Sequence, residues 1–224
     1  MKRLLIIFIL LFVLAAFLFA ENPIAVLVKV KGDITLLRNT KKLSVKAGEV
    51  LYHNDKIQSG NASYAALKYI DNGAYLKIFP NTIVSIKIDS EKGLAQKSAT
   101  IEKGTVFSSI NNKIKAKYKV ESPTTVASVK GTKYISSFGA DQIFFVYTTE
   151  GVVEAENLKS HTKMDVPAGS MLQSNPDGSM VVSKFSQLPN GWDEMLKDTE
   201  GAQKYKIELQ NSYGVKKYII IETE

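Results

Sequence analysis

The chain has 224 residues, enough for one sizeable domain or two small ones, with 45% hydrophobic residues and a formal net charge of +7. It contains no cysteine, which excludes disulfide bonds, thiolate metal sites, thiol nucleophiles and a lipid-modified cysteine. The charge is mild, so we expect no nucleic acid partner and only a weak attraction to anionic envelope surfaces.

The first twenty residues predict a secretory signal peptide. Lys2 and Arg3 precede an unbroken apolar run from Leu4 to Ala20, and Glu21 follows it. The run is close to the about 17–25 residues that span a bilayer, so an uncleaved anchor through residues 4–20 is the alternative. Both interpretations export residues 21–224 to the periplasm or cell envelope, because the basic start stays inside. Cleavage removes two basic side chains and leaves a net charge of +5.

From residue 24 onward, short runs rich in β-formers alternate with turn residues. Tight hairpin turns are indicated by Asp71-Asn72-Gly73 and Asp177-Gly178. The pattern predicts an all-β sandwich or roll, jelly-roll-like, of many short and mostly antiparallel strands. The expected strands are Ile24–Val30, Asp33–Arg38, Lys56–Ser59, Tyr64–Ile70, Ala74–Phe79, Thr82–Ile88, Thr105–Ile110, Lys117–Glu121, Lys133–Phe138, Gln142–Thr148, Val152–Glu156, Lys163–Val166, Ser170–Ser174 and Met180–Ser183.

Alternation along these strands locates the core. Val84, Ile86 and Ile88 share one face, and the run Ile143–Val146 is apolar on both faces, which is typical of a central strand covered twice. Every second residue from Lys113 to Lys119 is a lysine, and we interpret this row as a solvated strand face. A basic strip for an acidic polymer is the alternative.

A weak internal echo links two segments of the chain. Ala47-Gly48 and Ala168-Gly169 each lie between a strand end and a new apolar start. We favour two turns with glycine at positive φ over two related half-domains.

After residue 183 the pattern changes, and we treat 184–224 as a C-terminal extension. Trp192, Met195, Leu196 and Thr199 fall on one face of a short helix that ends by Gly201. Trp192 is the only tryptophan, and we expect a lid on the β core rather than a ligand platform. The run Val215–Glu222 predicts a terminal strand or an apolar tail that adds to the sheet edge or contacts a partner.

An ordered set of motifs runs from residue 24 to 183. It comprises Lys31-Gly32-Asp33, Ala47-Gly48, Asn54-Asp55 through Ser59-Gly60, Phe79-Pro80-Asn81-Thr82, Lys103-Gly104-Thr105, Ser122-Pro123, Val129-Lys130-Gly131-Thr132, Glu150-Gly151 and Ala168-Gly169. The set resembles the FecR domain, the extracytoplasmic domain of bacterial iron-dicitrate-type regulators, with Ser59 for the usual Thr and Lys130 for the usual Arg. The resemblance implies a FecR-like β domain over 21–183.

The resemblance also implies a set of signature residues with structural roles. We expect Gly131 to let the chain bend and Lys130 to make an internal contact in preference to a ligand contact. The signature residues are Gly48, Asp55, Gly60, Pro80, Asn81, Thr82, Gly104, Pro123, Lys130, Gly131, Thr132, Gly151 and Gly169.

No catalytic or metal-binding motif accompanies these residues. His53 and His161 are isolated, so we expect no enzyme, no metal and no cofactor. Only three residues precede the apolar run, too few for the cytoplasmic anti-sigma segment of the regulators. The leading hypothesis is an exported module that binds a protein partner or an envelope glycan. The alternatives are a membrane-anchored sensing component of a FecR-type signalling system and a secreted hydrolase.

Overall fold

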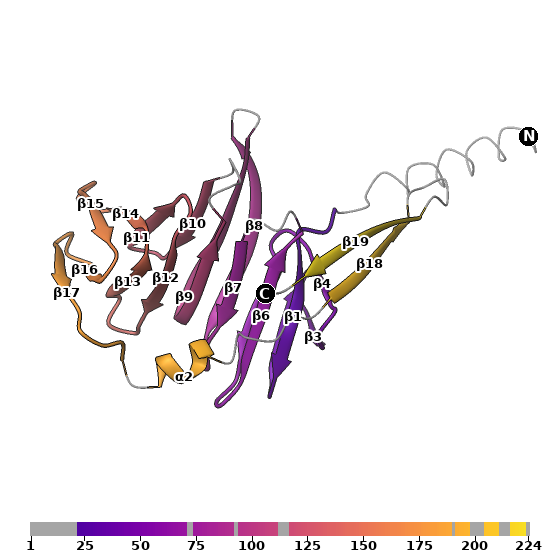
Figure 1. The fold of residues 1–224 in the computed structure, drawn as a ribbon. Helices are drawn as coiled ribbons and strands as arrows, with labels where there is room; N and C mark the ends of the chain where they lie inside the picture. Colours follow the sequence, from indigo (N-terminus) through magenta and orange to yellow (C-terminus); the bar gives the residue numbers. More distant parts are fainter. Residues whose placement is uncertain are drawn as a thin grey trace, which may run out of the picture.

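The computed structural model describes residues 22–70, 74–91, 94–111, 117–189, 191–197, 204–210 and 216–222. The predicted signal peptide, the lysines at 113 and 115 and the Asp71-Asn72-Gly73 turn lie outside the described residues. The rest is built almost entirely of β-strands, as expected, with one short helix (Figure 1).

The strands form two layers, which we name sheet A and sheet B. The order in sheet A is β4 (Val50–Leu51), β1 (Ala25–Lys31), β6 (Tyr64–Tyr69), β7 (Ala74–Ile78), β9 (Leu94–Ile110), β12 (Lys133–Phe138), β13 (Phe144–Glu150), β16 (Ser170–Ser174) and β17 (Met180–Lys184). The order in sheet B is β3 (Lys41–Ser44), β2 (Ile34–Arg38), β5 (Lys56–Ser59), β8 (Ile83–Glu91), β9, β10 (Lys117–Glu121), β11 (Thr125–Val129), β14 (Val152–Asn157) and β15 (Lys163–Pro167).

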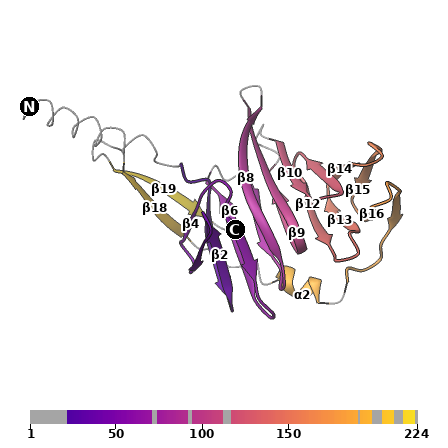
Figure 2. The same cartoon turned by 180° about the vertical axis from the view of Figure 1, so that it is seen from behind.

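Strand β9 belongs to both sheets and joins them. Its first half pairs with β8 and β10 in sheet B, and its second half, from Gly104 onward, pairs with β7 and β12 in sheet A. The pairing of β9 with β10 is parallel, whereas every other pairing among the described residues is antiparallel. The paired strands β8 and β9 extend beyond their neighbours, as seen from both sides (Figures 1 and 2).

The chain builds the two layers from hairpins that alternate between them. The hairpins β6–β7, β12–β13 and β16–β17 lie in sheet A, and β2–β3, β10–β11 and β14–β15 lie in sheet B. This connectivity differs from the jelly-roll-like expectation, because a jelly roll contains two Greek keys. Strands β3, β4, β11 and the first half of β9 were not predicted.

One hydrophobic core fills the space between the layers. Side chains that alternate along the strands of both sheets are fully buried in it, including Leu36, Leu67, Val84, Ile86, Phe144 and Leu172. Strand β13 lies between β12 and β16 and has partly buried aromatic side chains on its other face, as expected for a strand covered twice. The hydrophobic alternation therefore predicted the core correctly.

The C-terminal extension contributes two separate features. Helix α2 (Trp192–Lys197) confirms a short helix at Trp192, and the predicted end at Gly201 lies outside the described residues. Strand β19 (Lys216–Glu222) pairs with β18 (Lys204–Gln210) in a two-stranded sheet of its own, and no hydrogen-bonded pairing joins it to the large sheet within the described residues. The terminal strand was predicted, but β18 was not.

Candidate functional site

Almost all of the signature residues lie where the chain crosses from one sheet to the other. This includes Asp55, which directly precedes β5 after the crossing from β4. Only Pro123 lies elsewhere, in the β10–β11 hairpin of sheet B. The crossing positions are Gly48, Asp55, Gly60, Pro80, Asn81, Thr82, Gly104, Lys130, Gly131, Thr132, Gly151 and Gly169.

Hydroxyl groups bind three neighbouring crossings together. The Ser59 hydroxyl accepts a hydrogen bond from the Thr82 backbone N–H (3.0 Å) and donates to the Phe79 carbonyl (2.5 Å). The Thr82 hydroxyl accepts from the Thr105 N–H (2.9 Å) beside Gly104. Gly104 has φ +99° where β9 passes between the sheets. Ser59 retains the hydroxyl of the usual threonine, so the departure from the family pattern leaves these contacts intact.

A second group of crossings surrounds Gly131. The Thr132 hydroxyl donates to the Val152 carbonyl (3.0 Å), and a Cβ on Gly151 would lie 2.8 Å from the Gly131 carbonyl oxygen. Gly131 has φ +77°, which allows the bend we expected. Lys130 is exposed and makes no hydrogen bond or ion pair with the described residues, so the internal contact expected for it is not seen.

The echo at Gly48 and Gly169 is also explained by these crossings. Both glycines have positive φ and lie between a strand of sheet B and a strand of sheet A. The Gly48 N–H donates to the Leu27 carbonyl (2.7 Å), and the Gly169 N–H donates to the Thr148 carbonyl (2.9 Å). The two segments are turns of one kind, as the favoured interpretation held.

The buried Asp55 forms an ion pair with the partly buried Arg38, which the sequence did not reveal. Its carboxylate accepts from Arg38 Nε (2.9 Å) and Nη2 (2.7 Å) and from the Tyr52 backbone N–H (2.8 Å). The hydrogen bond to Asp55 raises the pKa of Arg38. Because this carboxylate is fully engaged and only 1% exposed, we assign the pair to structure rather than to binding.

The free edges of the two sheets differ in how they are protected. Strand β3 has lysines at 41 and 42, β4 has only two residues, and β15 has alternating charges and Pro167. These are the features by which sheet edges avoid pairing with other chains. Strand β17 (MVVSK) has no charged residue or proline before its final lysine. Its side chains Val181 and Val182 are 57% and 36% exposed.

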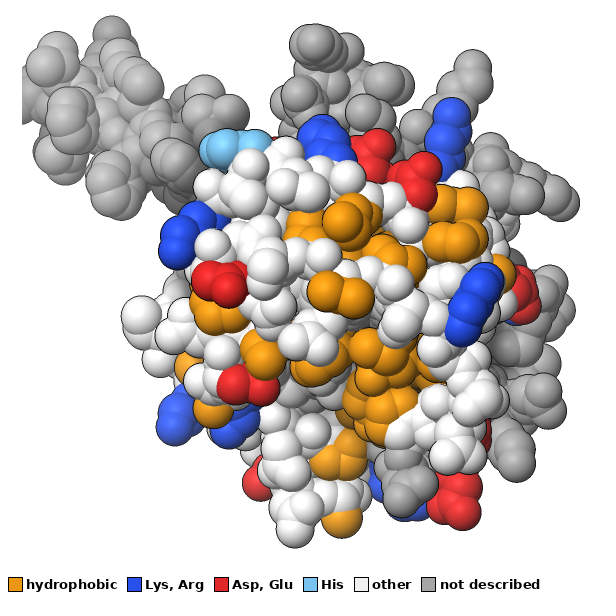
Figure 3. Space-filling model, turned by 90° about the vertical axis from the view of Figure 1, so that its left-hand side faces the viewer, with side chains coloured by type: hydrophobic (Ala, Val, Ile, Leu, Met, Phe, Trp, Pro, Cys, Tyr) orange, Lys and Arg blue, Asp and Glu red, His pale blue; other side chains and the backbone are white. Residues whose placement is uncertain are grey.

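The end of the molecule that β15 and β17 form has an apolar centre. Hydrophobic side chains gather in the middle of this face, and most charged side chains lie around its rim (Figure 3). Val182 faces the same side of sheet A as the core residue Leu172, its register partner, whereas Val181 faces outward beside Gln173. The unprotected edge of β17 therefore has apolar side chains on both faces.

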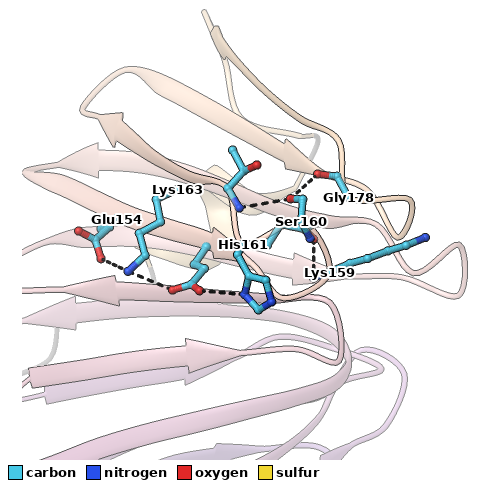
Figure 4. Close-up of polar contacts among 9 residues, drawn as sticks. Glu154, Lys159, Ser160, His161, Lys163 and Gly178 are labelled. Carbon is cyan, nitrogen blue, oxygen red and sulfur yellow. Dashed lines mark hydrogen bonds and ion pairs between the residues drawn. The ribbon is translucent and has the colours of Figure 1, made fainter.

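Loop contacts hold this end in place. Ser160 after β14 donates to the Gly178 carbonyl (2.8 Å), which joins a loop of sheet B to a loop of sheet A (Figure 4). Along β14 and β15, Lys163 pairs with Glu156 (3.1 Å) and Glu154 (3.9 Å), and the Lys163 hydrogen bond lowers the pKa of the partly buried Glu156. Lys163 of β15 thus pairs with both glutamates of β14.

The outer face of sheet A carries an aromatic cluster around Trp192. The Trp192 ring packs edge-on against Tyr147 (5.4 Å between ring centres) and Phe79 (6.0 Å), and Phe185 packs against Tyr147 (5.6 Å). Trp192 is thus a lid, as expected, but it covers the outer face of the sheet and not the core between the sheets.

The described ranges contain neither a candidate metal site nor a candidate membrane-spanning helix. No group of three or more His, Asp or Glu side chains there is placed to hold a metal ion. No helix among the described residues is long and apolar enough to cross a membrane.

Comparisons with known proteins agree with this architecture. A family model described as FecR protein matches residues 55–154, which cover the crossings from Asp55 to Gly151. No curated protein matches the chain.

Two crystal structures, each of a candidate anti-sigma factor from Parabacteroides distasonis, are similar to the chain. One is 12% identical with a TM-score of 0.51, covering 66% of each chain. The other is 14% identical with a TM-score of 0.49, covering 58% of this chain and 59% of that one. The chain spans less than two thirds of either protein, and the likeness at a TM-score of 0.51 concerns the fold alone.

Proposed function

Because residues 55–154 match the FecR family model, we propose that this chain is an exported, non-enzymatic module that binds a protein partner in the bacterial cell envelope. Export rests on the apolar run and basic start of residues 1–20. A place in envelope signalling, as a FecR-type regulatory component, is supported by the family match. The anti-sigma role named for the similar structures belongs to those proteins.

The observation that carries a binding role is the unprotected edge strand β17. An edge strand presents a row of backbone N–H and C=O groups, and an extended peptide satisfies them by adding one more strand. The other three edges are short or carry lysine, alternating charge or proline, so an added strand is favoured at β17.

The same geometry favours a protein over a glycan as the occupant. Only a polypeptide repeats donors and acceptors at the spacing of a β-strand, and its side chains alternate between the two faces. Here Val181 and Val182 offer apolar contacts on opposite faces of the sheet. We therefore propose a partner that contributes an extended, apolar segment beside β17.

The test uses a photoreactive residue at Ser183, which is exposed on β17. Crosslinking in intact cells yields a discrete adduct with one envelope protein, and the crosslink maps to a single extended segment of that protein. Absence of an adduct, or crosslinks scattered over many proteins, contradicts the proposal.

A matched pair of variants then measures the affinity for the crosslinked protein. Val181→Lys gives β17 the protection that β3 already has, and Val152→Lys makes the same change on β14, where Val152 is 49% exposed and both edges are already paired. We expect Val181→Lys to weaken binding by about tenfold or more, about 1.4 kcal/mol, and Val152→Lys to leave it unchanged. Equal affinity of the wild type, Val181→Lys and Val152→Lys for the crosslinked protein would exclude β17 as the binding site.

A further inference from the structure

The core between the sheets contains a group of buried hydroxyls, which we call the hydroxyl layer. None of their oxygens makes a hydrogen bond to any group in the described part of the chain. All five side chains are at most 1% exposed. The members are Ser108, Tyr118, Tyr134, Ser136 and Thr148.

The strand register brings these residues together. Ser108, Tyr134 and Thr148 are partners across β9, β12 and β13, so they form one row on the inner face of sheet A. Ser136 follows two residues after Tyr134 on the same face of β12. Tyr118 reaches the layer from β10 of sheet B, where its ring packs edge-on against Tyr69 (6.0 Å).

The hydroxyls of Ser108, Tyr118 and Tyr134 lie near one another. Burial raises the pKa of both Tyr118 and Tyr134, and the nearby Ser108 hydroxyl opposes that rise in each case. Ser108 therefore lies close to both phenols, although no direct hydrogen bond of acceptable geometry joins the three oxygens. A small molecule that both donates and accepts hydrogen bonds would satisfy all three oxygens at once.

Buried hydroxyls without partners are also energetically unfavourable. A buried hydroxyl without a partner destabilises the folded state, and five together would cost a free energy comparable with the whole stability of a domain. Internal water molecules typically make about three hydrogen bonds to such groups, and each needs two to four polar partners. The hydroxyl layer supplies enough polar partners for such a water, from sheet A and from Tyr118 of sheet B.

We infer that the hydroxyl layer is an internal water site, in which at least one ordered water molecule bridges Ser108, Tyr118 and Tyr134. Water is the ligand that fits, because every group in the layer is a hydroxyl that both donates and accepts. The site does not depend on the binding role proposed for β17, and it ties the two sheets together through their core.

The sign of a stability change tests the inference. Tyr118→Phe and Tyr134→Phe each remove one hydroxyl and keep the ring. If water occupies the site, each substitution lowers the urea midpoint, because a bridged hydrogen bond is lost. If the hydroxyls are unsatisfied, each substitution raises the midpoint. Tyr147→Phe, on the partly exposed outer face, is the control and leaves the midpoint unchanged.

A direct observation completes the test. Water-to-protein cross-relaxation in NMR is expected at the side chains of Ser108 and Tyr134, with a residence time longer than that of surface water. An unchanged or raised midpoint in both tyrosine variants overturns the inference, and so does the lack of cross-relaxation in the layer.

Discussion

Thr82 lies directly against the backbone of Gly104, so that a Cβ on residue 104 would be 2.5 Å from Thr82 Cα. The contact occurs where β9 leaves sheet B and enters sheet A, and the Thr82 hydroxyl bonds the next residue, Thr105. The junction of the two sheets therefore requires a residue without a side chain at position 104, at φ +99°.

Replacing Gly104 by alanine is expected to destabilise the protein by more than about 3 kcal/mol, because backbone strain and overpacking add. Gly169→Ala is the matched control, since Gly169 also has positive φ but a Cβ there meets nothing within 4 Å. The Gly169→Ala control is expected to lose only about 1–2 kcal/mol of stability, because it introduces backbone strain without overpacking. Urea denaturation measures both, and equal losses would show that the contact with Thr82 is unimportant.

The buried pair of Arg38 and Asp55 gives a second prediction. Asp55→Asn leaves the Arg38 guanidinium without its charged partner in a site where Asp55 is 1% exposed, and we expect a loss of about 3–5 kcal/mol. Glu150→Gln breaks the exposed pair of Lys133 and Glu150 (2.9 Å) and is expected to change stability by less than about 1 kcal/mol. Thermal unfolding of the two variants separates the cases, and a similar small shift in both would refute the assignment.

The buried tyrosines predict how stability depends on alkaline pH. The folded-state pKa of Tyr118 and Tyr134 is raised above the ordinary value of about 10 by burial. Their contribution is therefore fully present below about pH 10 and is lost as the pH rises from there towards the folded-state pKa. Tyr69 and Lys97 also face this region, with the Lys97 ammonium 5.5 Å from the Tyr69 ring centre.

The comparison with Tyr118→Phe isolates one of these groups. Above about pH 10 the wild type is expected to release about one proton more on unfolding than the variant, so its stability falls more steeply with pH. The slopes of the unfolding free energy against pH measure this difference. Equal slopes would mean that Tyr118 ionises as readily in the folded as in the unfolded protein.

The single tryptophan provides a probe of the aromatic cluster on sheet A. Tyr147→Ala removes the ring nearest to Trp192, so we expect its fluorescence emission to shift to longer wavelength as water reaches the indole. Tyr52→Ala, where the lost ring packs on Arg38 instead (4.6 Å), should leave the emission unchanged. A shift in both variants would indicate a general loosening of the fold.

Most of the strands could be predicted from the sequence, because their apolar residues alternate with the period of a half-buried sheet. Val84 and Ile86 are inside as that alternation requires. Strand β9 was predicted to begin at Thr105, directly after Gly104, whereas it begins at Leu94. The glycine instead bends a strand that continues, and the distinction depends on Thr82, a contact distant in sequence.

Parts of the candidate site depended on similarly distant contacts. Arg38 and Asp55 are polar residues that could have been solvated, and nothing near them in the sequence indicates their pairing. The exposure of Lys130 likewise follows from how β11 ends and not from its neighbours. The edge position of β17 depends on the order of the strands in sheet A, which the pattern of runs and turns leaves open.

Strand addition at β17 is measured by hydrogen–deuterium exchange of the exported protein, with and without the envelope protein crosslinked through Ser183. We expect amides of Met180–Lys184 to exchange more slowly in the complex, whereas those of Lys41–Ser44 on the lysine-protected edge do not change. Unchanged exchange in β17, with protection at another surface, would contradict strand addition there.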